Sequence, residues 1–262
     1  MSDPKAAFAR HVARIVAAGL IPERARRLDV LDLSCGRGDV LLEVAGRLPS
    51  GSRVVGVCDD RAQLDALHAR LAIIHGHHAI FPRHELPDRL PFADGVFDRV
   101  WAGLASTSLE PLRPVLRQAL RVLRPGGQLI IVALLRDTLM DLMRIAGQFM
   151  NNHEDSLRMR PLALDHARAL DRAAWEDAVR KSGAIDVETS THHFELEVGT
   201  PISDDPVLLE SIVPVWLGAD AKTNAETLSY LNGFMKAAFI LPISMIRVVC
   251  KRGDAPPRAA IG

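Results

Sequence analysis

The chain has 262 residues, of which 48% are hydrophobic, so it can form one large domain with a substantial core. Lysine plus arginine and aspartate plus glutamate number 32 each, and this balance lacks the excess of positive charge that nucleic-acid binding needs. No apolar run reaches membrane-spanning length, and Cys35, Cys58 and Cys250 have neither metal nor disulfide spacing. We therefore expect a cytoplasmic protein with no membrane insertion and no metal.

The first predicted element is a helix over residues 4–20, inside an N-terminal segment of residues 1–28. Arg10 and Arg14 interrupt its apolar sequence, which argues against a signal peptide. We expect its apolar face to cover a sheet, with a position over a ligand at the sheet edge as the alternative. That face consists of Phe8, Val12, Ile15 and Val16.

A strand, a tight turn and an amphipathic helix follow over residues 30–48. The strand ends at Asp32, and Gly36 and Gly38 allow the backbone to turn tightly and approach a ligand. A dinucleotide-binding loop would have a third glycine three residues later, but Leu41 stands there. This argues against a pyrophosphate ligand and disfavours a nicotinamide oxidoreductase.

Residues 53–57 predict a second strand, which is followed by two aspartates. A nucleotide ribose is bound by a carboxylate about 20 residues after the glycine loop. We take Asp59 as that ribose ligand. Asp60 is expected to cap the helix that begins near Ala62.

The middle of the chain continues this alternation of strands and helices. Asp94 and Gly95 predict a turn, and Leu123 to Gln128 predict another. The further elements expected here are strands at 79–81, 97–102 and 129–133, with an amphipathic helix at 112–123 between the last two.

The later part of the chain predicts a helix that begins after Asp171 and ends at Gly183. An edge strand at 184–197 and a last strand at 239–251 follow, and residues 253–262 are expected to form a flexible tail.

Two insertions, at about 134–168 and 199–238, are richly apolar and predicted to be helical. Connections of such length in a compact domain are usually functional, and these lie at the strand ends where open α/β sheets bind ligands. We expect them to form a lid over an acceptor pocket. An apolar face on residues 207–235 could also pair two subunits into a homodimer.

Four of these segments, in this order, resemble the class I S-adenosylmethionine-dependent methyltransferases. They are the acid and glycine loop at 32–38, the acid after the second strand, "LPF-x-D-x-x-FD-x-V" at 90–100 and "LRPGG" at 123–127. The resemblance implies a seven-stranded, mostly parallel Rossmann-like sheet with helices on both faces. It covers a methyltransferase domain at 29–252, and the LRPGG segment has a structural role in it.

The resemblance also implies where S-adenosylmethionine binds. Ser34 stands in place of the first glycine of the family loop, and Cys58 stands where the ribose acid usually comes, so Asp59 is one place late. Leu86 occupies the usual adenine acid position, which makes Glu85 the candidate after a one-residue slip. The expected cofactor residues are Asp32, Ser34, Gly36, Gly38, Asp59, Glu85, Leu86 and Ala102.

The expected function is methyl transfer to a small, fairly apolar acceptor at oxygen or carbon, with S-adenosylhomocysteine as the product. Residues 102–105 lack the Asn-Pro-Pro-Tyr type motif of relatives that methylate nitrogen in DNA or protein. The family has no universal catalytic residue, and His153 is the first candidate for a base. The alternative is a degenerate fold that serves as a binding or scaffold subunit. Further candidate bases are His166, His192, His193 and Tyr230, whereas His75, His77 and His78 are read as a surface turn.

Overall fold

The computed structural model describes residues 4–21, 27–73, 79–104, 109–148, 170–199, 229, 232 and 238–253. Its strands are β1 (Asp29–Asp32), β2 (Arg53–Cys58), β3 (Ala79–His84), β4 (Phe97–Leu104), β5 (Leu123–Leu134), β6 (Ala184–Val198) and β7 (Phe239–Arg252). Its helices are α1 (Pro4–Leu20), α2 (Asp39–Ala45), α3 (Arg61–Ile73), α4 (Leu109–Val122), α5 (Arg136–Gln148) and α8 (Arg172–Lys181). None of the described helices is long and apolar enough to cross a membrane.

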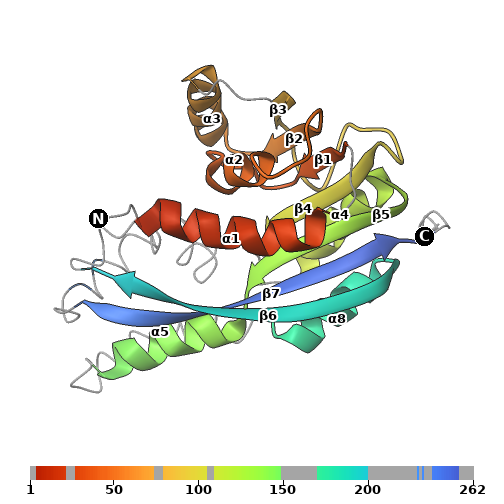
Figure 1. Cartoon of the computed structure of the whole chain (residues 1–262). Helices are drawn as coiled ribbons and strands as arrows, with labels where there is room; N and C mark the ends of the chain where they lie inside the picture. The colour runs from red at the N-terminus through yellow and green to blue at the C-terminus, as the bar shows by residue number, and fades with distance from the viewer. Residues whose placement is uncertain are drawn as a thin grey trace.

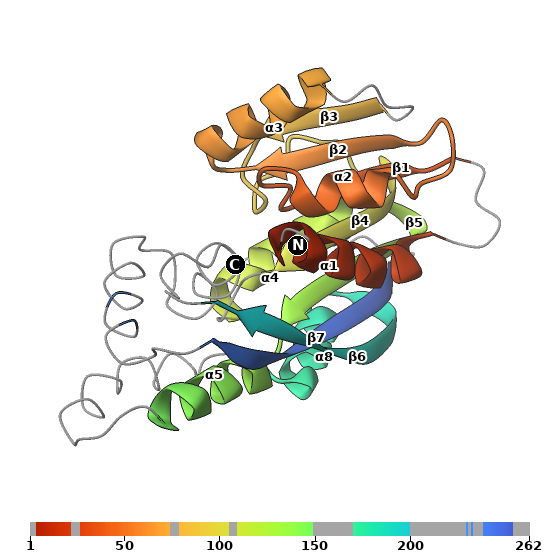
Figure 2. The ribbon, with the colours of Figure 1, turned by 60° about the vertical axis from the view of Figure 1, so that its left-hand side comes forward.

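The described strands form one seven-stranded sheet in the order β3-β2-β1-β4-β5-β7-β6. The first five strands pair in parallel, whereas β7 is antiparallel to both of its neighbours, β5 and β6. The predicted seven-stranded, mostly parallel α/β sheet is thus confirmed. The arrangement is visible in Figures 1 and 2, where β6 and β7 form a long twisted ribbon on one side of the sheet.

Helices cover both faces of the sheet because successive side chains of each strand point to opposite sides. Val30 and Trp101 pack with the helices α1, α2 and α3, while their neighbours Leu31 and Val100 pack with α4 and α8. The central strands are therefore apolar on both faces, as a parallel sheet requires. The predicted role of the first helix in covering the sheet is confirmed, since Val16 of α1 is fully buried.

Arg99 on β4 fixes the end of α1. Its Nε donates to the carbonyl oxygen of Leu20 at 3.2 Å, and its Nη1 donates to the carbonyl of Asp98 at 2.9 Å. The last carbonyls of a helix have no partner within the helix, so a cation here satisfies one and interacts favourably with the helix dipole. Partial burial lowers the pKa of Arg99 from its usual value.

Charged side chains tie the amino ends of the central strands together. The backbone N–H of Asp29 donates to Asp98 Oδ2 at 2.8 Å, and the guanidinium of Arg124 bonds both Asp98 and Asp29. Arg53 Nε donates to Asp29 Oδ1 at 2.7 Å, and this bond, with those from Arg124, lowers the pKa of Asp29. The two most recognisable sequence segments, "FD" and "LRPGG", thus meet in one ion-pair network, with Gly127 packed against the carbonyl of Asp98.

Several local predictions are confirmed, and one boundary is wrong. Asp171 caps α8 by accepting from the N–H of Ala174 at 2.9 Å, and Gly183 follows the helix with φ +94°. The turn predicted at 123–128 lies inside β5, which starts at Leu123 because that residue already pairs with β4 before the register shifts. The first insertion begins with α5, so its helical prediction is confirmed for residues 136–148, and 149–168 lie outside the described residues.

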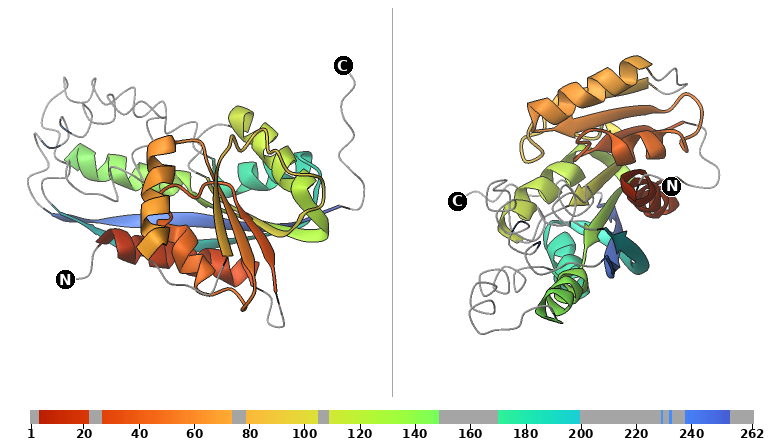
Figure 3. Two further views of the ribbon diagram at one scale, coloured as in Figure 1. Left: turned by 90° about the horizontal axis from the view of Figure 1, so that it is seen from above. Right: turned by 90° about the vertical axis from the view of Figure 1, so that its left-hand side faces the viewer.

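The connection from β3 to β4, residues 85–96, contains turns and bends but no helix. Its conformation is held by Arg121 of α4, which donates to the carbonyls of Leu90 and Phe92 and to Asp94. Consequently, β2 and β3 have helices on one face only, which Figure 3 shows from two further directions.

The Asp98 network gives a stability prediction. Asp98→Ala leaves the Asp29 N–H without its partner and the Arg124 guanidinium with Asp29 alone, so we expect the free energy of unfolding to fall by roughly 1–3 kcal/mol. Urea unfolding followed by circular dichroism measures this. The control is Asp88→Ala, whose carboxylate lies 3.9 Å from the exposed guanidinium of Arg89. Its loss should stay under about 0.5 kcal/mol, and equal losses in both variants would contradict the assignment.

Candidate functional site

A buried carboxylate organises the loop that follows β1. Asp32 is fully buried, and its Oδ1 accepts the backbone N–H of Ser34 at 2.9 Å. Its Oδ2 is buried without a hydrogen-bond partner among the described residues. Because burial penalises the charged form, the pKa of Asp32 is raised well above its usual range. Asp32 thus shapes the loop through Ser34, and its carboxylate is not presented to solvent.

The expected tight turn is present at both glycines. Gly36 has φ +49° and Gly38 has φ +84°, conformations that favour glycine. A Cβ at Gly38 would lie 2.4 Å from Cδ1 of Leu67, a fully buried side chain of α3. The loop therefore runs so close to α3 that a side chain at this position has no room.

The departure from the family loop, Ser34, has a structural role. Its hydroxyl oxygen accepts the backbone N–H of Gly103 at 2.9 Å, which ties the glycine loop to the carboxyl end of β4. Ala102, the neighbouring predicted site residue, is 1% exposed, so it can offer a ligand little more than its backbone. The structure brings Asp32, Ser34 and this part of β4 together, as the sequence predicts.

The residues after β2 divide between core, site and helix cap. Cys58 is buried, whereas Asp59 is exposed, and its carboxylate has no partner among the described residues. Asp60 caps α3, since its Oδ1 accepts the N–H of Gln63 at 3.1 Å, which confirms the prediction for Asp60. The carboxylate at this strand end that is free to meet a ligand is therefore Asp59, one place later than the family pattern.

Glu85 and Leu86 lie next to the same strand end. The backbone N–H of Glu85 donates to the carbonyl of Cys58 at 3.2 Å, and Leu86 is 50% exposed. The structure thus brings both adenine candidates near Asp59, at the carboxyl ends of adjacent parallel strands. Their contact with adenine stays a prediction.

The two cysteines of this region are structural. Gly56 allows them to pack closely, because a Cβ there would lie 2.9 Å from Cβ of Cys35. Burial raises the pKa of both Cys35 and Cys58, which keeps the thiols protonated and unreactive. Within the described part of the chain, no group of three or more His, Cys, Asp or Glu side chains could hold a metal ion.

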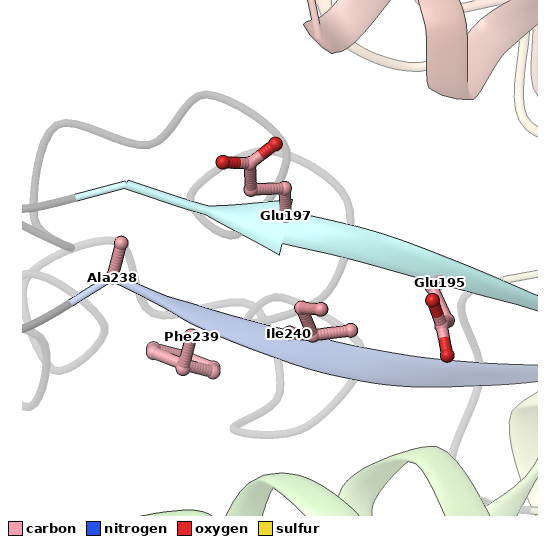
Figure 4. A pocket seen from close by; sticks show the side chains of 5 residues that line it. All are labelled: Glu195, Glu197, Ala238, Phe239 and Ile240. Carbon is pink, nitrogen blue, oxygen red and sulfur yellow. The ribbon is translucent and has the colours of Figure 1, made fainter.

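A cavity of about 460 Å³ lies at the end of the β6–β7 ribbon, also at the carboxyl edge of the sheet. Figure 4 shows its lining: Glu195 and Glu197 project from β6, and Ala238, Phe239 and Ile240 come from the start of β7. Sequence reasoning missed the two glutamates because alternating polar residues are ordinary on an edge strand. The one available signal was their position directly before the second insertion.

Of the five predicted bases, the structure describes His192 and His193, which are neighbours on β6. His153, His166 and Tyr230 lie outside the described residues, as do His75, His77 and His78. The imidazole of His192 lies 3.0 Å from the hydroxyl of Ser190, and that of His193 lies 3.0 Å from the hydroxyl of Ser244. The side chains of His192 and His193 are thus hydrogen-bonded within the β6–β7 ribbon.

Comparisons with known proteins agree with this architecture. Residues 30–127 match a family model described as a methyltransferase domain. A demethylmenaquinone methyltransferase of Symbiobacterium thermophilum is 32% identical over 101 residues, 38% of this chain and 40% of that protein. The 27-O-demethylrifamycin SV methyltransferase of Amycolatopsis mediterranei is 34% identical over 115 residues, 44% of this chain and 41% of that protein.

A likeness of fold extends over nearly the whole chain. The crystal structure of the YcgJ protein from Bacillus subtilis has a TM-score of 0.58 over 96% of this chain and 99% of that chain, at 14% identity. The similarity in sequence covers a shorter part of the chain than the similarity in fold. The chain spans only about two-fifths of the length of the curated relatives it matches.

The close contact between Gly38 and Leu67 predicts that Gly38→Ala lowers the free energy of unfolding more than Gly51→Ala does. Gly51 has a similar φ of +78° but nothing within 4 Å of a Cβ, so alanine there adds only backbone strain of about 1 kcal/mol. Alanine at Gly38 adds the collision with Leu67, and overpacking costs about 1–3 kcal/mol more. Chemical unfolding of both variants measures the difference. Equal losses would show that Leu67 moves away freely.

Asp32 predicts a pH dependence of stability. Its pKa is higher in the folded than in the unfolded chain, so its contribution is full below the unfolded value and is lost as pH rises toward the folded value. Asp32→Asn removes this titration and keeps an acceptor for Ser34. The Tm of the variant relative to wild type should therefore rise between pH 5 and pH 8 in thermal scans. A constant difference across that range would refute the buried-carboxylate argument.

Proposed function

We propose that this chain, whose residues 30–127 match a methyltransferase domain and whose fold resembles solved structures of this class, is a class I S-adenosylmethionine-dependent methyltransferase that transfers the methyl group to a small, fairly apolar acceptor at oxygen or carbon. The observation that carries the proposal is the edge of the sheet where β1, β2 and β4 end. There a close-packed glycine loop, the Ser34 bridge and the free carboxylate of Asp59 lie together.

The residues at this edge fit the cofactor. The exposed carboxylate of Asp59 suits the two ribose hydroxyls, with Glu85 and Leu86 beside it for the adenine. The loop at Ser34, Gly36 and Gly38 would hold the methionine end, beside Asp32, whose Oδ2 has no hydrogen-bond partner among the described residues. When bound, S-adenosylmethionine supplies a methyl group on a positively charged sulfur.

The chain's own contribution is positioning and the exclusion of water. We place the acceptor in the cavity at the end of the β6–β7 ribbon, where Phe239 and Ile240 offer apolar surface. Glu195 or Glu197 could take the proton of an acceptor hydroxyl, and His153, outside the described residues, stays the candidate base from the sequence. An apolar acceptor agrees with the relatives, whose names refer to menaquinone and to a rifamycin. The two insertions would cover the bound acceptor. We further propose that the enzyme is cytoplasmic and forms a homodimer through these insertions.

The alternative, a binding subunit without catalysis, depends on the departures at Ser34 and Cys58. The geometry weakens that reading, because Ser34 is engaged with Gly103 and Cys58 is buried behind an exposed Asp59. An assay of S-adenosylhomocysteine formed from S-adenosylmethionine in the presence of small phenols and hydroquinones separates the two functions. Tight cofactor binding without turnover on any acceptor would favour the subunit.

Calorimetric titration with S-adenosylmethionine tests the site, and adjacent aspartates supply a matched pair. Asp59→Asn removes the charged acceptor, so we expect the affinity to fall about tenfold. Asp60→Asn keeps an equally good helix cap and should bind like wild type. Absence of binding by wild type at millimolar cofactor would overturn the proposal, and equal weakening in both variants would overturn the assignment of Asp59.

A further inference from the structure

A second cavity, of about 230 Å³, lies away from the cofactor edge on the face of the sheet that α4 and α8 cover elsewhere. It is bounded by Asp29 of β1, Arg53 and Val55 of β2, Phe81 and Arg83 of β3, and Phe92, Val96 and Phe97 before and at the start of β4. Arg53 and Phe97 are the first residues of their strands, so the cavity extends to the amino ends of the strands. The glycine loop lies at the opposite, carboxyl ends.

The cavity exists because the β3–β4 connection has no helix to cover this face. Phe81 is 49% exposed, although an aromatic side chain in the middle of a strand normally packs under a helix. Beside it, Phe92 and Phe97 pack edge to face with ring centroids 5.2 Å apart, which makes a firm apolar wall. The site thus offers a preformed aromatic surface for a small apolar group.

Positive charge borders this apolar surface. Arg83 is exposed and has no hydrogen-bond or ion-pair partner among the described residues. Arg53 uses its Nε for Asp29, whose carboxylate is also bonded by Arg124 and is therefore already neutralised. The free guanidinium of Arg83 is the group that can bind an anion, and two parallel N–H bonds to a carboxylate are its strongest pairing.

We propose that this cavity binds a small organic carboxylate whose apolar body is about the size of one aromatic ring. The volume is below the roughly 300–1,000 Å³ of sites for drug-sized ligands, which limits the body to that size. The ring would lie against Phe81, Phe92 and Val55, with the carboxylate on Arg83. A second copy of the chain adding a strand here is disfavoured, because Pro82 removes a backbone N–H from the edge strand β3.

The test is an NMR titration of the full chain with 3-phenylpropionate, with its uncharged amide as the matched probe. We expect saturable shifts of the backbone amides of Val55, Phe81 and Arg83, and at least fivefold weaker binding of the amide. Arg83→Gln should weaken binding of the carboxylate at least fivefold and abolish its advantage over the amide. Arg89→Gln, the same change of charge at an exposed residue outside the cavity, should bind like wild type.

Three results would overturn the proposal: shifts that do not saturate, equal affinity in Arg83→Gln and wild type, or a concentration-dependent dimer in light scattering that hides Phe81 and prevents binding. Arg83 is exposed, so its substitution should leave the fold intact, which circular dichroism checks. The titration is independent of the proposed function. Probe binding without binding of S-adenosylmethionine would leave this inference standing and remove the other.

Discussion

The carboxylate of Asp32, buried at the end of the first strand, is the constraint around which the site is arranged. One oxygen holds the N–H of Ser34, and the Ser34 hydroxyl in turn holds the N–H of Gly103. Two strand ends that are 69 residues apart in sequence are thereby fixed to each other. The second oxygen of Asp32 has no partner in the described structure, and an unsatisfied buried polar atom costs stability. The chain tolerates this cost at the edge where a ligand would bind.

The two edges of the sheet differ in how fully their polar groups are paired. At the amino ends, Asp29, Asp98, Arg53 and Arg124 form a network in which every charge has an opposite partner. At the carboxyl ends, by contrast, Asp59 stands free. Fully paired charges stabilise a fold, whereas unpaired groups held in place by a rigid frame are available for ligands. The amino ends of the strands therefore contribute to stability, and the carboxyl ends carry the groups available to a ligand.

Features that depend on neighbouring residues could be predicted from the sequence. The helix cap at Asp60, the turn at Gly95 and the two-sided burial of the strands follow from local chemistry and periodicity. The fold class followed from the order of four family segments. The exposed Phe81 was not foreseen, because it depends on a helix that is absent from the β3–β4 connection. Arg99 was missed as well, because its partner Leu20 lies 79 residues away.

The position of β7 has a consequence for the order of assembly. β7 is the last strand in chain order, yet it lies between β5 and β6, pairing with β6 along nearly its whole length and with β5 along its second half. During synthesis, the parallel strands β1 to β5 and their helices can assemble first, while β6 has no neighbour in the sheet. The ribosome must release β7 before β6 can join, so the cavity at the end of the β6–β7 ribbon forms last. A nascent chain halted before residue 239 would therefore hold the cofactor edge without the ribbon.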